Sequence, residues 1–372
     1  MRFTISKEEL LKGLLTAGHA VGSASANPTL SSFKLEVTSK GLEITSSNGD
    51  ISIWTLVPEY REETQVIRNS SIGSVLINAK IFTEVAKRLS GGEVTVEIID
   101  NAIAKIDDGK SSFKLNCMDA DEYPDIDFEK NGNSFAVTCD AISKLTAQTA
   151  FAASDKNRPV LGAVNLKAEA GILTATATDS ARLSRKSIAV EPNLRFSANI
   201  PAKTLSDIVK MFDSVEEVEI SASKEKIVFS FGTTIVTSRL ISEDYPVSNS
   251  IVPQVFNYYL EINSQQLLNA IDRVSTISSD KASVVKLSMT ADNVEISSSS
   301  DQNGSGVEKL TTIQFTGDRL DIAFNASFVS QAVRALGCED VTFSFVGEMR
   351  PFVIKNPEDD SVVELITPMR MR

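Results

Sequence analysis

The chain has 372 residues and a formal net charge of −12, with 42% hydrophobic and 23% charged residues. Taken alone, such an acidic total argues against a nucleic-acid binder, and the composition is typical of a soluble globular protein. The length exceeds what one hydrophobic core usually supports, so we expect more than one domain.

Signals for export or membrane insertion are not visible in the sequence. The start, MRFTISKEELL, lacks the apolar stretch of a signal peptide, and no apolar run is long enough to span a membrane. Cys117, Cys139 and Cys338 are odd in number and show no CxxC spacing, which predicts buried free thiols in a reducing compartment. We therefore expect a cytoplasmic protein.

Six segments have helical patterns: 7–20, 79–90, 139–154, 202–212, 264–279 and 326–336. Three of them belong to versions of one sequence: NAKIFTEVAKRL starts at residue 78, PAKTLSDIVKMF at 201 and NASFVSQAVRAL at 325, which is 123 and 124 residues apart. Ser6 with Glu9, and Asn263 with Gln266, look like capping boxes at helix starts. A period of about a third of the chain indicates three copies of one unit.

Alternating strands follow the helices in each third of the chain. They are EVTVEI (93–98), EVEISA (217–222) and DVTFSF (340–345), and the pairs FKLEV (33–37) with LEITSS (42–47), VNLKA (164–168) with ILTATAT (172–178), and VVKLSM (284–289) with NVEISS (293–298). The related segments EYPDID (122–127) and DYPVSN (244–249) mark the transitions, because proline ends a strand. We predict an α+β fold of three repeated domains, 1–125, 126–250 and 251–372, each with two helices and two antiparallel sheets.

The helical segments carry more positive charge than the rest of the chain. They contain ten basic and six acidic residues, a net charge of +4, which leaves −16 for the strands and loops. Repeats of this kind join through their sheet edges and leave two unmatched ends, whose head-to-tail pairing gives a filament or a closed ring. If the helices lined such a ring, they would offer a DNA duplex phosphate contacts that carry no sequence information.

The sequence offers little for catalysis. Its one histidine, His19, lies near the end of the first helix, where a structural role is expected, and no GxGxxG or GxxxxGK[ST] motif follows a strand. Asp119, Asp121, Asp125 and Asp127 carry suitable oxygens for a divalent cation, but no histidine or second acidic motif completes a two-metal site. We therefore expect no enzyme, no cofactor and no metal.

Two other classes of function remain open at this point. One is a metal-dependent phosphoesterase that uses the acidic residues between Asp119 and Asp127. The other is a self-assembling structural repeat protein that polymerises through open sheet edges.

The whole chain resembles the bacterial sliding clamp family, the beta subunit of DNA polymerase III. The resemblance rests on NAKIF (78–82), YPDI (123–126), ATDSARLS (177–184), DYP (244–246) and ITPMR (366–370), in family order across all three thirds. It implies a non-catalytic processivity factor: a head-to-tail homodimer that forms a six-domain ring around duplex DNA, with the helices lining the lumen. A clamp-loader ATPase opens such a ring, which then tethers the replicative DNA polymerase and other proteins that carry short clamp-binding peptides.

The resemblance also implies a peptide pocket between the second and third domains. Its expected residues are Leu161, Thr178, Ser180, Arg182, Leu183, Pro246, Ile251, Leu365, Thr367, Pro368, Met369 and Arg370. Apolar side chains with few polar groups suit an adaptable cleft for apolar peptide anchors. Two positions depart from the family: Ala181 stands where histidine is frequent, and Thr367 stands where an apolar residue is common.

Two further sets of residues follow from the resemblance and the helical pattern. The family's ring seam corresponds here to Phe113 and Leu115 on one side and to Thr276 and Ile277 on the other, with Thr276 in place of a frequent aliphatic residue. The residues that we expect to face DNA are Lys12, Lys80, Lys87, Arg88, Lys144, Lys156, Arg158, Lys203, Lys210, Arg273 and Arg334.

Overall fold

The structure, a computed structural model, describes residues 1–22, 27–130, 132–156, 158–212, 215–246, 251–278 and 283–370. All six predicted helices are confirmed: α1 (Lys7–Gly18), α2 (Ala79–Arg88), α3 (Cys139–Ala147), α4 (Ala202–Val209), α5 (Ser264–Ser275) and α6 (Ala326–Leu336). The third ends earlier than predicted. Near its end, the hydroxyls of Thr146 and Thr149 donate to the carbonyls of Ile142 (2.8 Å) and Leu145 (2.6 Å), a competing pattern that weakens helices.

The predicted capping boxes are half right. Ser6 Oγ accepts from the backbone N–H of Glu9 (3.2 Å), and Asn263 Oδ1 accepts from that of Gln266 (3.1 Å). The reciprocal bonds, in which the side chains of Glu9 and Gln266 would accept from the backbone N–H groups of Ser6 and Asn263, are not made. Both side chains have other partners. Glu9 forms an ion pair with Arg61 (3.0 Å), and the Gln266 amide exchanges hydrogen bonds with the backbone of Thr311.

The strands confirm the predicted alternating segments. The first third has β1 (Arg2–Ser6), β2 (Ser32–Thr38), β3 (Gly41–Ser47), β4 (Ile51–Pro58), β5 (Tyr60–Arg61), β6 (Thr64–Gln65), β7 (Ile67–Ser71), β8 (Gly73–Asn78), β9 (Glu93–Ile99), β10 (Ile103–Asp107) and β11 (Ser112–Met118). The second has β12 (Asn133–Thr138), β13 (Ala163–Glu169), β14 (Ile172–Thr178), β15 (Arg182–Ala189), β16 (Phe196–Pro201), β17 (Glu217–Ala222), β18 (Lys226–Phe231) and β19 (Thr234–Arg239). The last has β20 (Tyr258–Asn263), β21 (Val284–Met289), β22 (Val294–Ser300), β23 (Gly304–Leu310), β24 (Gln314–Thr316), β25 (Leu320–Asn325), β26 (Asp340–Phe345), β27 (Phe352–Asn356) and β28 (Asp359–Ile366).

The same antiparallel pairing occurs in all three thirds, which confirms the repeat. The strand before the first helix of each third pairs with the strand after its second helix, as β1–β9, β12–β17 and β20–β26. The strand after the first helix pairs with the strand before the second, as β2–β8, β13–β16 and β21–β25. Each third is therefore built from two interlocked copies of one helix-and-strand pattern.

Contacts divide the chain into two compact units, and the division passes through the middle third. Unit 1 comprises Met1–Cys139 and Asp207–Leu240, and unit 2 comprises Asp140–Ser206 and Ile241–Arg372. Unit 1 contains a 13-stranded sheet in which β12 and β17–β19 continue the strands of the first third. Unit 2 contains a nine-stranded sheet in which β13–β16 continue the strands of the last third, and a four-stranded sheet of β23, β22, β21 and β25.

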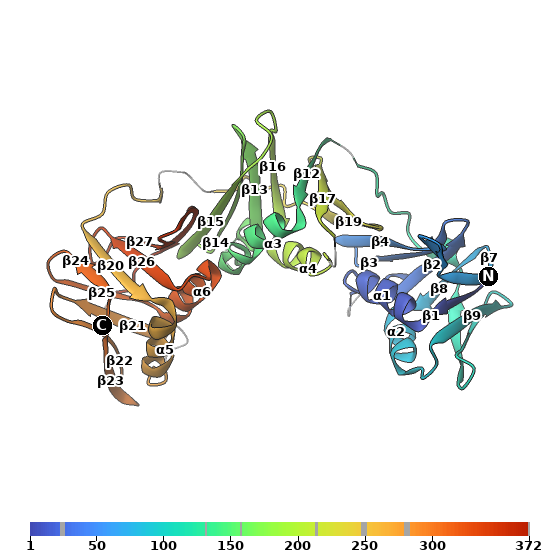
Figure 1. The fold of residues 1–372 in the computed structure, drawn as a ribbon, viewed down its shortest axis with the longest axis horizontal. Coiled ribbons are helices and arrows are strands. Elements are labelled where there is room, and N and C mark those ends of the chain that lie inside the picture. Colours follow the sequence, from blue (N-terminus) through green and yellow to red (C-terminus); the bar gives the residue numbers. More distant parts are fainter. Residues whose placement is uncertain are drawn as a thin grey trace. The chain divides into compact units, whose positions relative to one another are not determined.

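The thirds join through one kind of strand pair. In unit 1 the last strand of the middle third, β19, pairs with β4, which is the third strand after α1 (Figure 1). In unit 2 the last strand of the chain, β28, pairs with β15, which is the third strand after α3. We call these pairs the β4–β19 seam and the β15–β28 seam.

The corresponding strands at the two other ends lack this pairing. β11 is the last strand of the first third, and its contact with β8 is limited to Cys117 and Met118. From Ser112 to Asn116, β11 pairs with β10 on one side. Its other edge has no partner strand among the described residues. β23, the third strand after α5, pairs with β22 alone in the described part of the chain.

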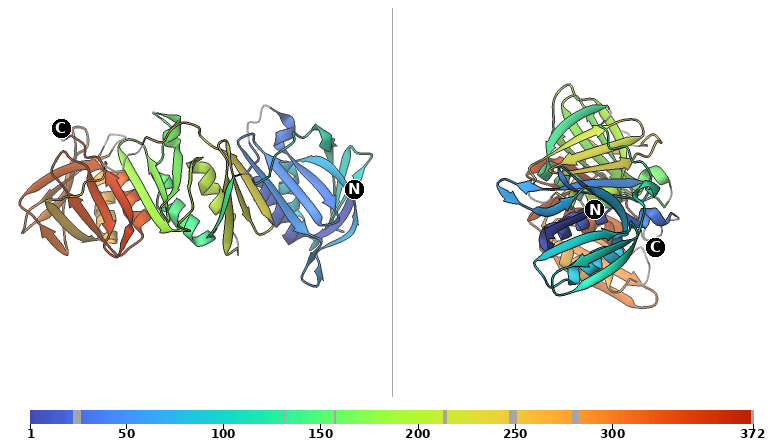
Figure 2. Two further views of the ribbon diagram at one scale, coloured as in Figure 1. Left: turned by 90° about the horizontal axis from the view of Figure 1, so that it is seen from above. Right: turned by 90° about the vertical axis from the view of Figure 1, so that its right-hand side faces the viewer.

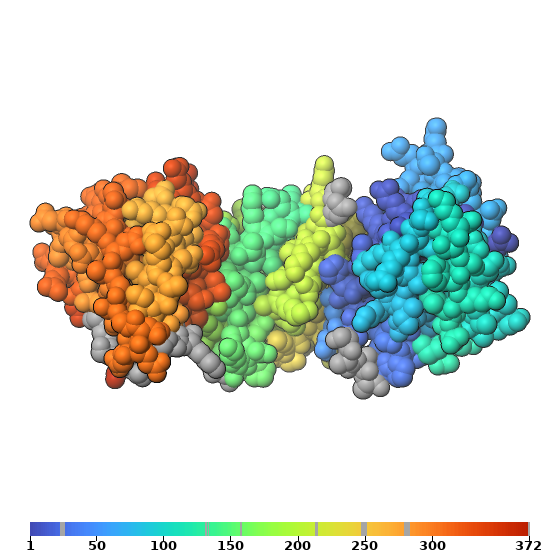
Figure 3. Space-filling model, turned by 90° about the horizontal axis from the view of Figure 1, so that it is seen from below, coloured from blue at the N-terminus to red at the C-terminus, as the bar shows by residue number. Residues whose placement is uncertain are grey.

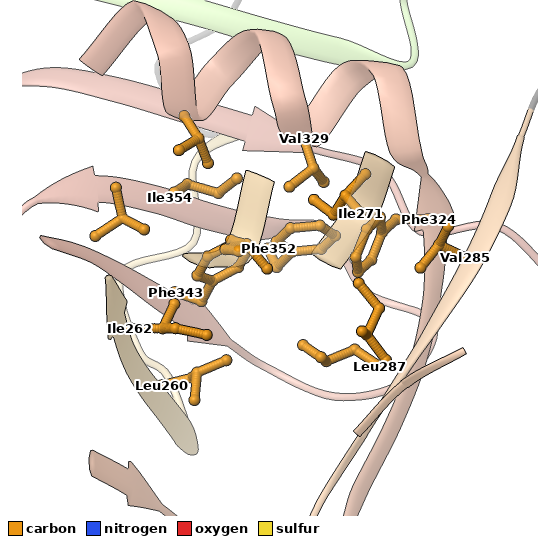
Figure 4. Close-up of a cluster of buried hydrophobic side chains, with 14 of the residues drawn as sticks. Leu260, Ile262, Ile271, Val285, Leu287, Phe324, Val329, Phe343, Phe352 and Ile354 are labelled. Atoms are coloured by element: carbon orange, nitrogen blue, oxygen red, sulfur yellow. The ribbon is translucent and has the colours of Figure 1, made fainter. Parts of the chain in front are cut away.

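Each unit has its own apolar core beneath its helices. In unit 2, side chains from α5, α6 and both sheets converge, among them Ile271, Val329, Phe324, Phe343 and Phe352 (Figure 4). Each fully buried side chain of this size contributes about 1.5–3 kcal/mol to folding. In unit 1, α1 and α2 lie side by side on the sheet, and Figure 2 (left) shows the blue antiparallel strands of that sheet next to one another.

The cysteines are free thiols, as predicted, but they differ in burial. Only Cys139 is buried, while Cys117 and Cys338 are half-buried because each lies at the margin of a core. Among the described residues, no helix is both long and apolar enough to span a membrane.

Candidate functional site

Unit 2 contains a pocket of about 350 Å³ where β15 and β28 pair. Its lining residues are Arg158, Leu161, Thr178, Ser180, Arg182, Leu183, Pro246, Ile251, Pro351, Leu365 and Thr367. Leu183 and Leu365 are cross-strand partners in the seam, so the pairing of the two strands sets the separation of two apolar walls. Nine of the twelve residues expected from the resemblance are brought together here.

A tight turn carries one side of the pocket. The carboxylate of Asp179 accepts from the backbone N–H groups of Ala181 (2.9 Å) and Arg182 (3.0 Å), which fixes the start of β15. Ser180, between Asp179 and Ala181, has a φ of 79°, a left-handed conformation that non-glycine residues adopt with strain. The segment ATDSARLS therefore forms a rigid turn that presents Thr178, Ser180 and Arg182 to the pocket.

Tyr245 connects the segment DYP (244–246) to this turn. Its hydroxyl accepts from the backbone N–H of Thr178 (3.1 Å) and lies 3.3 Å from the carbonyl oxygen of Ala163, to which it donates. Burial raises the pKa of Tyr245, so the phenol stays neutral and can make both bonds. Pro246, the next residue, is thereby held at the pocket wall.

The two arginines of the pocket differ in how much they are engaged by the protein. The Arg182 guanidinium donates to Asp179 (3.0 Å), to the carbonyl of Phe151 (2.6 Å) and to Gln331, and it lies 4.4 Å from the ring centre of Phe328. Arg158 is exposed and forms a long ion pair with Glu243 (3.7 Å). Arg182 is thus part of the pocket's framework, and Arg158 is the more available cation.

Three expected pocket residues lie beside the pocket and not in its lining. The N–H of Met369 donates to the carbonyl of Ala323 (2.7 Å), which ties the tail after β28 to β25. Pro368 is buried, and Arg370 is exposed. Sequence reasoning missed Pro351 as a lining residue, because the turn before β27 carries no motif, and it assigned Arg158 to DNA because its charge was the visible signal.

The expected seam residues belong to β11 and to the end of α5, which packs against β23. Phe113, on the open edge of β11, is 40% exposed, and Leu115 packs against the core of unit 1. Ile277 packs so closely on β23 that a Cβ on Gly306 would lie 2.6 Å from its Cδ1. Thr276 caps α5 and is exposed. Val307, on the same edge strand, is 67% exposed and was not anticipated.

All eleven residues expected to face DNA are exposed. Several of them form ion pairs with nearby acids: Lys87 and Arg88 with Glu84, Lys144 with Asp140, Lys210 with Asp207, Arg273 with Glu308 of β23, and Arg334 with Asp272. In Figure 3, where the helices of unit 1 are turned toward the viewer, the α1 (blue) and α2 (cyan) surfaces adjoin. Exposed lysines of both helices, Lys12 and Lys80, therefore belong to one helical layer.

The acidic segment around Asp119 is engaged by its own chain. Asp119 Oδ1 accepts from the N–H of Asp121 (3.0 Å), and the ion pair with Lys226 (2.5 Å) lowers the pKa of Asp127. In the part of the chain that the structure describes, no three histidine, cysteine, aspartate or glutamate side chains are placed to hold a metal ion. His19 is exposed at the end of α1.

Comparisons with known proteins give one consistent result. Three family models match in succession: the N-terminal domain of the DNA polymerase III beta subunit over residues 1–127, its central domain over 136–247 and its C-terminal domain over 249–370. The chain is 33% identical over 376 residues to the beta sliding clamp of Bacillus subtilis, with complete coverage of both. It superposes on the crystal structure of the Bacillus subtilis sliding clamp with a TM-score of 0.95 (32% identity), and on that of the DNA polymerase III beta chain of Streptococcus pneumoniae with 0.94 (30% identity), covering all of each chain. This chain therefore belongs to the DNA polymerase III beta subunit family, the beta sliding clamps.

Proposed function

We propose that the protein is a DNA sliding clamp, a non-catalytic processivity factor that forms a head-to-tail homodimeric ring around duplex DNA. The observation that carries this proposal is the unmatched pair of edges, β11 and β23. Both intrachain seams follow one rule. The last strand of one domain-sized part of the chain pairs with strand number three after the first helix of the preceding part. β11 and β23 are the remaining strands of these two types, so a second copy supplies the missing partner to each.

The edge residues support this pairing. Long exposed strand edges are sites of association, and exposed apolar side chains there strengthen the tendency. Phe113 on β11 and Val307 on β23 are 40% and 67% exposed in the single chain. Because the two edges differ, the contact is heterologous, and two such contacts close a dimer if the rotation per chain is a half turn.

The pocket in unit 2 is proposed as the site for short peptides of partner proteins. Its walls of leucine, isoleucine and proline suit two or three apolar anchors, each contributing about 1.5–3 kcal/mol before ordering costs. The resulting affinity is weak to moderate, which allows partners to exchange. The partners proposed are the replicative DNA polymerase, the clamp-loader ATPase and other DNA-processing proteins of the cytoplasm.

The helices are proposed to line the lumen and to contact the DNA backbone without reading bases. Replacing a contacting lysine should lower the salt dependence of DNA association by about one unit of slope per lost phosphate contact. Lys80→Gln on α2 tests this, with Lys40→Gln in the turn between β2 and β3 as the control, since both lysines are exposed. Equal effects of the two changes would contradict the proposed lumen.

Retention on circular plasmid tests the proposed function as a whole. The protein is loaded onto nicked circular DNA with a clamp-loader ATPase and ATP, and the DNA is then linearised. Retention on circles with rapid loss after linearisation is expected of a closed ring. Equal retention on both forms would show ordinary surface binding and refute the ring.

A further inference from the structure

Beneath the pocket, the β15–β28 seam contains a buried carboxyl group. Glu364 is 2% exposed and lies opposite Ser184 in the strand pair, with 2.8 Å between Glu364 Oε1 and Ser184 Oγ. Its neighbour Leu365 and the cross-strand Leu183 form pocket walls on the other face of the same strands. Glu364 therefore lies directly behind the pocket.

The hydrogen bonds around Ser184 contain one proton too few for an ionised glutamate. Ser184 Oγ is within hydrogen-bond distance of two oxygens, Glu364 Oε1 and the backbone carbonyl of Gln148. A serine hydroxyl has one hydrogen, and a carbonyl oxygen accepts only. If Ser184 donates to the Gln148 carbonyl, the second bond forms only when Glu364 carries a proton and donates it to Ser184 Oγ.

The charges facing Glu364 lead to the same conclusion. Two cations of β15 share its face of the sheet, Arg182 on one side and Lys186 on the other. Arg182 is already paired with Asp179 (3.0 Å) and Lys186 with Asp359 (2.7 Å).

Among the described residues, the elements packed against this face add no further cation. Toward Arg182, α6 presents the Gln331 amide and the Phe328 ring, and the segment after α3 presents the carbonyl of Phe151. Gln148 adds a buried side-chain oxygen, Oε1, that has no partner among the described residues. Beside Asp179 and Asp359, an ionised Glu364 would be a third anion facing only two cations. Burying such an unmatched charge is costly. Burial accordingly raises the pKa of Glu364 well above its usual range.

We propose that Glu364 is protonated at neutral pH and is a positioning residue, whose proton holds β15 and β28 together behind the pocket and links peptide affinity to pH. This inference rests on the proposed peptide-binding function of the pocket. Ionisation leaves one hydroxyl hydrogen for two acceptors, so Ser184 loses its bond either to Glu364 or to the Gln148 carbonyl. It also introduces an unmatched charge, so the two pocket walls lose their fixed separation. Peptide affinity is then highest while the proton is bound and falls as the pH rises through the pKa of Glu364.

The protonation is tested by infrared spectroscopy of the full chain at pH 7.5. A protonated carboxylic acid has a carbonyl stretch that a carboxylate lacks. The band is expected in the wild type, absent in Glu364→Gln and unchanged in Glu358→Gln, an exposed neighbour. Absence of a Glu364-dependent band would overturn the proposal.

The coupling is tested with a synthetic peptide of two leucines and a phenylalanine, by measuring its dissociation constant between pH 6 and pH 9. We expect the wild-type affinity to fall about fivefold or more at the alkaline end, in the usual range of linked equilibria. Glu364→Gln, which keeps a donor, should bind at the acidic-limit affinity at every pH, and Ser184→Ala should bind weakly throughout. A wild-type profile that Glu364→Gln does not change would refute the coupling. A complete failure to bind the peptide would instead refute the proposed pocket, while the infrared band would still decide where the proton is.

Discussion

The two intrachain seams have the same topology but different chemistry. In the β4–β19 seam the buried polar contact is between neutral hydroxyls, with Thr55 Oγ1 and Thr234 Oγ1 2.9 Å apart. In the β15–β28 seam the contacts involve ionisable groups, Ser184 with Glu364 and Lys186 with Asp359. The seam with ionisable groups is also the one that carries the pocket.

This difference shows which property of a seam is general and which is local. Backbone hydrogen bonds join the strands in both seams, and contacts between hydroxyl side chains are sufficient to support such pairing. Buried ion pairs add little net stability compared with apolar groups, but they are sensitive to the loss of one partner. The β15–β28 seam should therefore respond far more strongly than the β4–β19 seam to substitution and to pH.

The largest effect is expected from removing a partner of the buried lysine. The side chain of Lys186 is 9% exposed, and within the described part of the chain Asp359→Ala leaves it one polar side-chain partner, Ser361 Oγ at 2.7 Å. The free energy of unfolding should fall by about 3 kcal/mol, measured by urea denaturation. Asp360→Ala is the control, because that side chain is 94% exposed, and it should change stability by less than about 0.5 kcal/mol. Similar losses in both variants would contradict the assignment.

The proposed third seam, between β11 and β23 of two chains, should be sensitive to loss of apolar area. Phe113→Ala is expected to weaken the dimer by about 2 kcal/mol, or roughly thirtyfold in Kd, as is typical of an aromatic residue central to an interface. Ile277→Asp should do the same, because it displaces the support of β23. Ile72→Ala, which changes another exposed side chain of unit 1, is the control. Sedimentation that shows an unchanged dimer at low micromolar concentration would rule out this assignment.

A smaller effect is expected in the β4–β19 seam, where the buried contact is between two hydroxyl groups. Thr55→Val removes one hydroxyl of the buried pair and should cost about 1 kcal/mol in unfolding free energy. The double variant Thr55→Val/Thr234→Val should lie close to the wild type, because both polar partners are then gone. A double variant that loses the sum of the two single effects would show that the hydroxyl contact is not the reason for the cost.

A separate effect, confined to acid, is expected from the protonation of Asp359 in the wild type. The hydrogen bond from Lys186 lowers the pKa of Asp359 to about 2 from an ordinary 3.8. Since the folded-state pKa is depressed, this stabilisation is complete above about pH 4 and is lost as the pH falls toward 2. Hydrogen exchange of β28 amides should show this loss, and Asp359→Asn should flatten the dependence between pH 4 and 2. Amides of the β4–β19 seam serve as the internal reference.

Most of the secondary structure could be predicted from the sequence, because the repeat presents each pattern three times. The helix starts at Ser6 and Asn263 were visible as capping residues. The early end of α3 was not, because Thr146 and Thr149 are compatible with a helix until their hydroxyls bond to the backbone.

The pocket was predictable where motifs mark it and not elsewhere. The turn around Asp179 and the DYP segment led to Thr178, Arg182 and Pro246. Pro351 and the role of Glu364 were not accessible. In the alternating strand DDSVVELI, Glu364 resembles an ordinary solvent-facing glutamate, and only the pairing of β28 with β15 buries it. Contacts between segments that lie far apart in the sequence decided both cases.

A complementation experiment tests the head-to-tail pairing of β11 with β23 most directly. Phe113→Asp damages one edge and Val307→Asp the other, so each variant alone should sediment as a monomer. In an equimolar mixture, the intact β23 of the first variant meets the intact β11 of the second, and one seam can form. We expect a dimer in the mixture alone. A mixture that remains monomeric, or a dimer of either variant by itself, would contradict head-to-tail pairing through these strands.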